Sequence, residues 1–239
     1  MPTMLITGGS RGIGAETVRR FAREGYRVAF VYHKSEEAAE ALVRETGAYA
    51  IRADLSSKEE TLRAAHAALD FFGTSPDVLI NNAAVAGFSL FTDISYEDWR
   101  RFFALNVDAA FLLTKELLPG MISRKSGRVI NISSMWGQVG SSCEVHYSTT
   151  KAALIGMTRA LAKEVGPSGV TVNCIAPGLI DTDMNASLSK DDIAAICEET
   201  PLCRIGTPAD VAEAALFLAG RGGDFITGQV LGVNGGYVI

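Results

Sequence analysis

Little in the sequence favours a metal centre, a disulfide framework or a membrane span. The four cysteines form no Cys-x-x-Cys pair, and the three histidines form no cluster with metal-ligand spacing. We therefore expect no metal site and reduced thiols in a cytoplasmic protein. The most apolar stretch, from Ala104 to Leu118, is interrupted by residues that include Asn106, Asp108 and Lys115, so it predicts a buried helix instead of a membrane span.

A strong net charge and a targeting signal are lacking as well. The formal net charge of −5 gives no reason to expect nucleic-acid binding. The segment from Met1 to Thr7 has no basic region followed by a long apolar stretch, so we expect no secretory signal. A chain of 239 residues with 48% hydrophobic and 21% charged residues fits one globular domain over residues 1–239.

Short β-rich runs alternate with helical patterns along the chain. This alternation predicts an α/β fold with a doubly wound parallel sheet of about seven strands, of the Rossmann type. The expected strands are Met4–Thr7, Arg27–Tyr32, Ala48–Ala53, Val78–Asn81, Arg128–Ile132, Thr171–Ile175 and Val230–Val233. The expected helices are Ile13–Glu24, Glu36–Glu45, Glu59–Phe71, Tyr96–Met121, Tyr147–Val165 and Pro208–Ala219.

The segment 178–206 breaks the alternation. It carries clusters of Asp, Ser and Lys, a short helical pattern near Lys190–Glu199, and Pro201. An excursion of this kind after a strand predicts either a lid over a substrate or a helical insertion at the surface without a gating role.

A glycine-rich loop, Thr7-Gly8-Gly9-Ser10-Arg11-Gly12-Ile13-Gly14, follows the first expected strand and opens the first expected helix. In this context the glycines allow a tight turn, and the N–H groups at the helix N-terminus meet a pyrophosphate. The loop therefore predicts a dinucleotide site.

The residues after the second expected strand indicate which dinucleotide binds. An NAD site places a carboxylate there to bind the ribose, whereas this chain has Tyr32-His33-Lys34-Ser35. Together with Arg11, Lys34 suits a 2′-phosphate, so we predict NADPH. Asp54, after the third strand, either accepts from the adenine amino group or caps the next helix.

Tyr147 and Lys151 lie four residues apart, which places both on one face of a helix. A neighbouring cation favours the ionised form of an acid, so we expect Lys151 to lower the pKa of Tyr147. A tyrosine tuned in this way exchanges a proton with a carbonyl or alcohol oxygen. With hydride from a dinucleotide, this chemistry is ketone reduction or its reverse.

Several motifs in order give the chain a resemblance to a known family. They are the Thr7–Gly14 loop, Asn81-Asn82-Ala83-Ala84, Asn106, Ser134, Tyr147-x-x-x-Lys151, Pro177-Gly178, and the ending Thr227-Gly228-Gln229 with Asn234-Gly235-Gly236. On these motifs the chain resembles the short-chain dehydrogenase/reductase family over nearly its whole length. Ala84 departs from the glycine usual in the family.

The resemblance implies a role for each motif residue. Tyr147 is the expected general acid, Lys151 holds the nicotinamide ribose, Ser134 binds the substrate oxygen, and Asn106 places a water in a proton relay. Ser133 competes with Ser134 for its role. The implied cofactor-binding residues are Gly8, Ser10, Arg11, Gly12, Ile13, Gly14, His33, Lys34, Ser35, Asp54, Leu55, Asn82, Ala83, Ala84, Tyr147, Lys151, Pro177, Gly178, Ile180 and Thr182. The family also implies a homotetramer built on the helices 96–121 and 147–165.

Within the family, the pattern is most similar to 3-oxoacyl-[acyl-carrier-protein] reductases, enzymes of fatty acid biosynthesis. Their acidic carrier protein needs a basic docking surface, for which Arg124, Lys125 and Arg128 are candidates. The turn Gly166–Gly169, where such reductases commonly offer another basic residue, has none.

The loop between Ser134 and Tyr147 should line the substrate pocket, and it holds Trp136, Cys143 and Glu144. A Trp and a Glu suit a cationic ketone, and this run is similar to reductases of the 5-aminopentanone group on a lysine of elongation factor P. Glu144 otherwise caps the following helix.

The sequence offers two further functions besides ketone reduction, and each has an argument against it. His146 could indicate a Ser–His–Asp hydrolase, but the chain has no Gly-x-Ser-x-Gly motif. Adjacent residues of a helix point in different directions, so we expect His146 to face away from the Tyr147 pocket. A cofactor-binding sensor without catalysis has no reason to keep the full set of motif residues.

Overall fold

The computed structural model describes residues 1–186 and 188–239. Their strands form one seven-stranded parallel sheet in the order β3-β2-β1-β4-β5-β6-β7. The strands are β1 (Thr3–Thr7), β2 (Arg27–Tyr32), β3 (Tyr49–Arg52), β4 (Val78–Asn81), β5 (Gly127–Ile132), β6 (Val170–Pro177) and β7 (Val230–Val233). All seven expected strands are confirmed, and the predicted single-domain, doubly wound Rossmann-type fold is correct.

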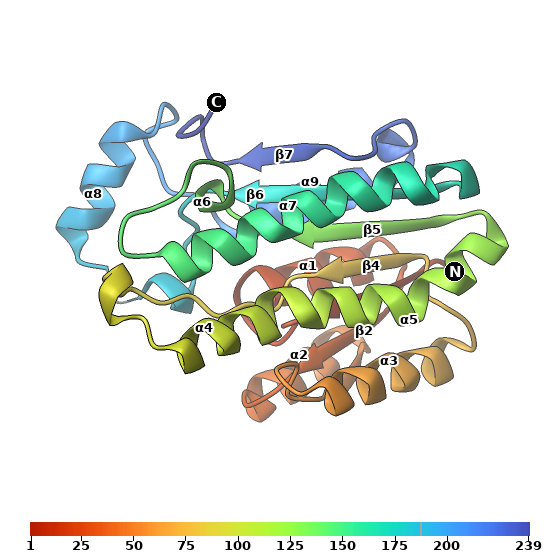
Figure 1. The fold of residues 1–239 in the computed structure, drawn as a ribbon. Helices are drawn as coiled ribbons and strands as arrows, with labels where there is room; N and C mark the ends of the chain where they lie inside the picture. The colour runs from red at the N-terminus through yellow and green to blue at the C-terminus, as the bar shows by residue number, and fades with distance from the viewer. Residues whose placement is uncertain (187) are drawn as a thin grey trace.

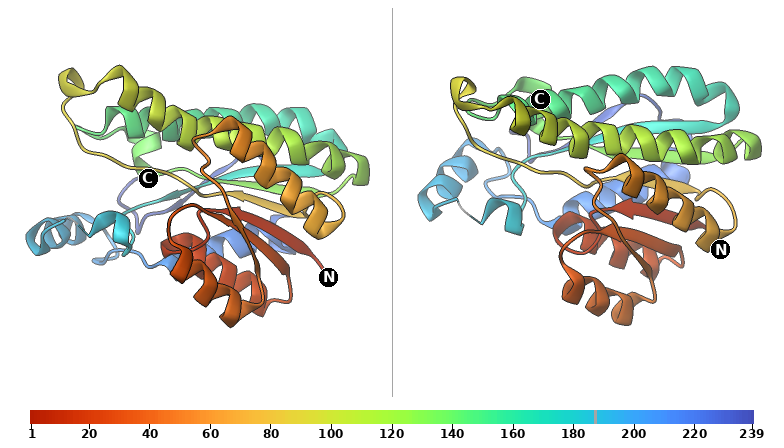
Figure 2. Two further views of the ribbon diagram at one scale, coloured as in Figure 1. Left: turned by 90° about the horizontal axis from the view of Figure 1, so that it is seen from below. Right: turned by 60° about the horizontal axis from the view of Figure 1, so that its bottom comes forward.

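Helices connect the strands and cover both faces of the sheet (Figure 1). They are α1 (Gly12–Arg23), α2 (Glu36–Thr46), α3 (Lys58–Phe72), α4 (Tyr96–Phe103), α5 (Ala109–Arg124), α6 (Met135–Val139), α7 (Val145–Val165), α8 (Lys190–Glu199) and α9 (Pro208–Ala219). Figure 2 shows α3, α5 and α7 in one layer and α1 and α9 in the other. Among the described residues, no helix combines the length and apolarity needed to cross a membrane.

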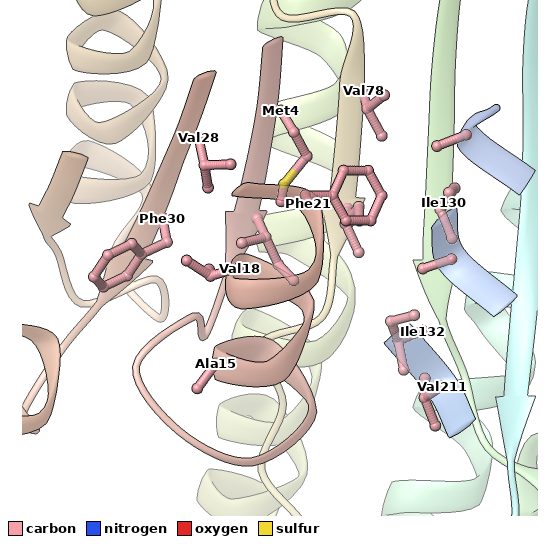
Figure 3. Packing of buried hydrophobic residues seen from close by; sticks show 14 of the residues in the cluster. Met4, Ala15, Val18, Phe21, Val28, Phe30, Val78, Ile130, Ile132 and Val211 are labelled. Carbon is pink, nitrogen blue, oxygen red and sulfur yellow. The ribbon is translucent and has the colours of Figure 1, made fainter. Parts of the chain in front are cut away.

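Alternate side chains of the central strands serve two separate cores, because successive residues of a strand face opposite sides of the sheet. Met4 and Ile6 of β1 join the cluster beneath α1 and α9, while Leu5 joins the cluster beneath α3, α5 and α7. Figure 3 shows the first cluster, in which Val18 and Phe21 of α1 lie over the sheet. The two cores hold the sheet rigid between its helical layers.

The expected helix 96–121 is interrupted at its middle. A π-helical turn, Ala104–Asp108, separates α4 from α5 and contains the buried Asn106. The Asn106 amide bonds both the N–H and the carbonyl of Val85, which ties this turn to the loop after β4. Periodicity alone does not reveal a turn of this kind, because an inserted residue changes the helical phase only locally.

The carboxyl ends of the strands all meet at one edge of the sheet, and the chain order reverses there between β1 and β4. In open α/β sheets, ligands bind in the crevice beyond this reversal. The short helix α6, the starts of α4 and α7, and helix α8 gather at the same edge (Figure 1). The candidate site is therefore built on this edge.

Candidate active site

The glycine loop between β1 and α1 fits a pyrophosphate. Gly8 and Gly12 have positive φ angles of 65° and 54°, a conformation that disfavours side chains. A Cβ on Gly14 would collide with the Gly8 carbonyl, so the helix packs directly on the loop. Helix α1 has no acidic residue in its first turn and no side-chain cap, which leaves its N-terminal N–H groups available to an anion.

Three segments distant in sequence converge on this loop. The Thr7 hydroxyl accepts hydrogen bonds from the backbone N–H groups of Asn82 and Ala83, each at 2.9 Å. The Asn82 amide donates to the carbonyl of Thr7 at 2.8 Å. The methyl group of Thr182 lies beside Gly12. The structure therefore brings together the expected cofactor residues after β1, β4 and β6.

The residues expected to contact the adenosine half follow β2 and β3. His33 and Lys34 are exposed, and the His33 ring lies 3.9 Å from the Asp54 carboxylate. The Asp54 carboxylate accepts from the N–H and hydroxyl of Ser56, and these bonds lower its pKa. Helix α3 is capped by Ser57, whose hydroxyl accepts from the Glu60 N–H, so the capping alternative for Asp54 is wrong.

Other expected cofactor residues have structural positions that fit the same edge. Leu55 and Ile180 are buried, and Ile180 pairs with Gly206 in an isolated bridge. Pro177 ends β6, and Gly178 lies so close to Asn234 that a side chain at Gly178 would contact its backbone. Ser10, Ile13, Ser35 and Ala84 are partly buried at the ends of β1, β2 and β4.

Tyr147, Lys151 and Ser134 lie together at the carboxyl edge, with exposed fractions of 8%, 2% and 7%. Helix α7 positions Tyr147 and Lys151, and Ser134 is the N-cap of α6, where its hydroxyl accepts from the Trp136 N–H at 3.1 Å. The Ser134 hydroxyl also interacts with the Tyr147 phenol and moderates its pKa.

The expectation that Lys151 lowers the pKa of Tyr147 is wrong, because the pKa of Tyr147 is raised. Burial raises the pKa of Tyr147 to about 12, and it lowers the pKa of Lys151 to about 8. The Lys151 ammonium lies 5.6 Å from the Tyr147 ring and donates to the Ile132 carbonyl at 2.7 Å. Desolvation therefore outweighs the neighbouring cation here, and Tyr147 is firmly protonated at neutral pH.

The structure distinguishes the two neighbouring serines. The buried Ser133 hydroxyl donates to the backbone carbonyl of Lys151 at 2.8 Å, which fixes helix α7 against the end of β5. Ser133 thus holds the helix, while Ser134 shares the pocket with Tyr147. Binding of the substrate oxygen by Ser134 stays a prediction.

The side chain of Asn106 does not reach Lys151. Its amide nitrogen donates to the Val85 carbonyl and the Thr150 hydroxyl, both at 3.0 Å, so both of its N–H groups are engaged. Thr150 in turn donates to the carbonyl of Tyr147. Asn106 therefore stabilises the start of α7 around Tyr147 through Thr150. Its role in a proton relay stays a prediction.

The sequence did not reveal a second set of buried hydrogen bonds, which joins β4, β5 and α7. Asn81 at the end of β4 donates to Asn131 of β5 at 2.8 Å, and Asn131 donates to the Thr158 hydroxyl of α7 at 2.8 Å. The pairing of Asn81 with Asn131 across the two strands depends on their register, which the sequence does not show. The signal that could have found it is a polar residue in each of two strands otherwise read as apolar.

Glu144 is the N-cap residue of α7, but its side chain makes no capping hydrogen bond. It is partly buried and accepts from the Ser141 hydroxyl at 3.2 Å, and burial raises its pKa. The capping alternative is therefore not supported.

The neighbours of Glu144 in the same loop also lie at this edge. The carbonyl of Cys143 accepts from the Ser89 N–H at 2.7 Å, which joins the loops after β4 and β5. The Trp136 ring meets the Tyr237 ring edge-on at 5.8 Å. His146 is buried against the Phe102 ring, consistent with the expectation that it points away from Tyr147.

The proposed basic docking patch lies at the edge of the sheet opposite to Tyr147. Arg124 ends α5 and Arg128 belongs to the start of β5, whereas Ser134 follows the other end of that strand. Arg128 is paired with Asp224 at 2.7 Å, and Arg124 donates to the Pro76 carbonyl at 3.1 Å. Lys125, the third member of the patch, is exposed, and docking of a carrier protein at these residues stays a prediction.

The two ends of the segment 178–206 are bonded to each other. Besides the bridge between Ile180 and Gly206, the Gly206 N–H donates to the Leu179 carbonyl at 2.8 Å. Helix α8, expected near 190–199, is confirmed, and its described side chains are exposed or only partly buried. Position 187, within the proposed lid, lies outside the described residues.

Comparison with known proteins agrees with this geometry. The family profile described as "Enoyl-(Acyl carrier protein) reductase" matches residues 8–238. The 3-oxoacyl-[acyl-carrier-protein] reductase FabG of Aquifex aeolicus is 40% identical over 97% of this chain and 95% of its own. The uncharacterized oxidoreductase YmfI of Bacillus subtilis is 36% identical over 98% of both chains.

Solved structures agree in fold over nearly the full length. A short-chain dehydrogenase/reductase mutant from Serratia marcescens has a TM-score of 0.92 and 33% identity, covering 99% of this chain and 97% of its own. A blue fluorescent protein from a metagenomic library, in complex with NADPH, has a TM-score of 0.94 and 35% identity, covering 100% and 98%. The chain belongs to the short-chain dehydrogenase/reductase family and is an oxidoreductase.

Proposed function

We propose that the protein is an NADPH-dependent reductase that converts a ketone to a secondary alcohol, with Tyr147 as the general acid. The observation that carries this proposal is the burial of Tyr147, Ser134 and Lys151 at the edge of the parallel sheet that also carries the glycine loop. When bound, NADPH would supply the hydride for the carbonyl carbon. The phenol of Tyr147, protonated at neutral pH, gives its proton to the carbonyl oxygen, and the Ser134 hydroxyl donates a hydrogen bond to that oxygen.

Lys151 stabilises the phenolate that Tyr147 leaves behind. Its pKa of about 8 keeps it cationic at neutral pH, and burial strengthens its attraction for a negative oxygen nearby. Its other role is to hold the ribose of the cofactor. Arg11 and Lys34 supply the positive charge for the 2′-phosphate, in agreement with the NADPH bound by the blue fluorescent protein.

The first candidate substrate is a 3-oxoacyl thioester carried by acyl carrier protein. The FabG relative supports this substrate by its identity over nearly the full length. Within one chain, the candidate docking residues Arg124 and Arg128 lie at the edge of the sheet opposite to Tyr147.

A second candidate is a ketone that carries an amine, such as the 5-aminopentanone group on a lysine of elongation factor P. The partly buried Glu144 favours it, because this carboxylate is free of the helix cap and pairs with no cation in the described part of the chain. The Trp136 ring lies in the same loop and suits a cation. A non-catalytic NADPH sensor is the distant third candidate.

We also propose a homotetramer that uses the outer faces of α5 and α7. Phe111 of α5 is 50% exposed. Helix α7 presents small exposed residues, Ala152, Gly156 and Ala160, which allow a partner helix to approach closely. Sedimentation at micromolar concentration tests this assembly, and a monomer would contradict it.

The function is tested by following NADPH consumption with an acetoacetyl thioester and with an amine-bearing ketone. Ketone-dependent consumption that is lost in Tyr147→Phe supports the proposal. Preference for the thioester assigns the first substrate class, and preference for the amine-bearing ketone assigns the second.

A further inference from the structure

A buried histidine, His146, directly precedes Tyr147 on α7. It is 3% exposed, and its Nδ1 atom has no hydrogen-bond partner in the part of the chain that the structure describes. A neutral imidazole carries one N–H group, whereas a protonated imidazole carries one on each ring nitrogen. Protonation of His146 would therefore bury a charge and leave the N–H group at Nδ1 without an acceptor, which is unfavourable.

The His146 ring packs against α4 and against the loop after β4. Its centroid lies 3.8 Å from that of the buried Phe102 ring of α4, at an interplanar angle of 31°. A Cβ on Gly87 of the loop would lie 2.9 Å from the Phe102 ring and 3.4 Å from Nε2 of His146, so the loop packs directly on both rings. The three residues therefore form one tight contact between α4, α7 and the loop after β4.

Few charges face this contact. Residues 84–91 of the loop include no charged residue. Helix α4 contributes Asp98 and Arg101, which pair with each other at 3.2 Å. Burial lowers the pKa of His146 from its usual value of 6.5, while Asp98 raises it and Arg101 lowers it, so the imidazole is neutral at pH 7. The other ionisable residues of these elements are either exposed, namely Glu97, Arg100 and Asp108, or belong to the start of α7 and its N-cap, namely Glu144, Tyr147 and Lys151.

The loop that meets His146 is also joined to the residues around the catalytic tyrosine. The Ser89 N–H of this loop donates to the Cys143 carbonyl at 2.7 Å, just before α7 begins. A second connection runs from the loop through Asn106 to the first turns of α7. Because His146 and Tyr147 are adjacent in the chain, separating the imidazole from the loop would also shift the phenol.

We propose that His146 is a positioning residue whose protonation breaks the contact with Phe102 and Gly87, so that ketone reduction fails in mild acid. The inference rests on the proposed ketone reduction and adds a pH dependence to it. A histidine released from this contact regains a pKa near 6.5. Each pH unit below that value therefore favours the broken contact by up to about tenfold.

The activity test compares profiles of kcat/KM between pH 5 and 7.5, measured with NADPH and each of the two ketones and normalised at pH 7.5. We expect the unmodified protein to lose at least about tenfold at pH 5, and His146→Leu, which keeps an apolar side chain but binds no proton, to lose less than about threefold. His66→Leu removes an exposed histidine of α3 and should behave like the unmodified protein. Burial raises the pKa of Glu144, so Glu144→Gln is a second control and should keep the loss in acid. Parallel profiles in the unmodified protein and His146→Leu would overturn the proposal.

Urea unfolding separates this inference from the reaction itself. Below about pH 6.5, the unfolding constant of the unmodified protein should rise relative to that of His146→Leu, by up to about tenfold for each pH unit, because the unfolded chain binds a proton that the buried imidazole excludes. This pattern without turnover of either ketone would support the contact and reject the proposed reaction. Equal pH dependence of unfolding in the two proteins would overturn the inference, and Tyr147-dependent turnover would then leave the reaction standing. Should His146→Leu not fold, His146→Asn supplies the same comparison.

Discussion

The two halves of the catalytic edge carry opposite charge. The loops after β1 and β2 contain Arg11 and Lys34 and no carboxylate. The loops from β4 to α4, from β5 to α7 and from β6 to α8 contain only carboxylates as charged residues, namely Asp93, Glu144, Asp181 and Asp183. Arg204, in the loop after α8, is paired with Asp210. The first half suits the phosphates of a dinucleotide, whereas the second suits a neutral or cationic substrate.

The halves also differ in how they are held. Glycine contacts and the bonds from Thr7 to the β4 loop fix the cofactor half, so its shape depends on the backbone. The substrate half is built from longer loops and from α8, whose side chains are only partly buried. The shape of the cofactor half is therefore fixed by the backbone, while we expect the loops of the substrate half to select the substrate.

The largest expected effect on turnover comes from Tyr147, which lies between the cofactor half and the substrate half. Tyr147→Phe should lower kcat by about 10²–10⁴-fold, since it removes the proton donor and keeps the ring. NADPH affinity should change little. Steady-state kinetics and cofactor titration check this; near-normal turnover would refute the acid role.

Reversing the charge of the cofactor half should change its specificity. Lys34→Glu should weaken NADPH binding by about tenfold or more, because a carboxylate repels the 2′-phosphate, and should leave NADH binding nearly unchanged. Dissociation constants for both cofactors measure the effect. Lys58→Glu, at the start of α3, is a control of equal charge change. Equal losses for the two cofactors would contradict the assignment.

The buried Lys151 should make stability depend on pH. Its pKa falls from a usual value of about 10.5 to about 8, so above pH 8 the unfolded chain binds a proton that the folded protein releases. The free energy of unfolding should therefore rise between about pH 8 and 10, relative to Lys151→Met. Urea unfolding of both proteins across this range checks it, and parallel curves would contradict the burial of a charged amine. Tyr147 acts in the opposite direction only above about pH 10, where its raised pKa keeps the folded protein protonated.

The smallest expected effect is a change in KM when Glu144 of the substrate half is replaced. Glu144→Gln should raise KM several-fold for an amine-bearing ketone and leave KM for a neutral ketone unchanged, since an exposed ion pair contributes up to about 1 kcal/mol. Asp93→Gln removes a carboxylate of the same edge as a control. Equal changes for both ketones would show that Glu144 acts on the loop and not on the substrate.

The fold was predictable because its signals are local and repeated. Each strand is a short apolar run, and each connection from strand to helix follows the same pattern. The break at Asn106 was not predictable, because it results from bonds to Val85, a residue 21 positions away. The same holds for the register that pairs Asn81 with Asn131.

The sequence predicted which residues share the site better than it predicted their pKa values. The spacing of Tyr147 and Lys151 placed both on one face of α7, as expected. The sign of the Tyr147 pKa shift depends on how deeply the phenol is buried, which no spacing reveals. The edge of the sheet on which Arg124 and Arg128 lie could not be predicted either, because charge composition does not say which edge a residue occupies.

The most direct test of the account is whether the unmodified protein oxidises NADPH in response to a ketone. With an acetoacetyl thioester and an amine-bearing ketone offered separately, the account predicts turnover of at least one, and much slower turnover when NADH replaces NADPH. Tight NADPH binding with turnover of neither ketone would contradict it and would favour a cofactor-binding sensor.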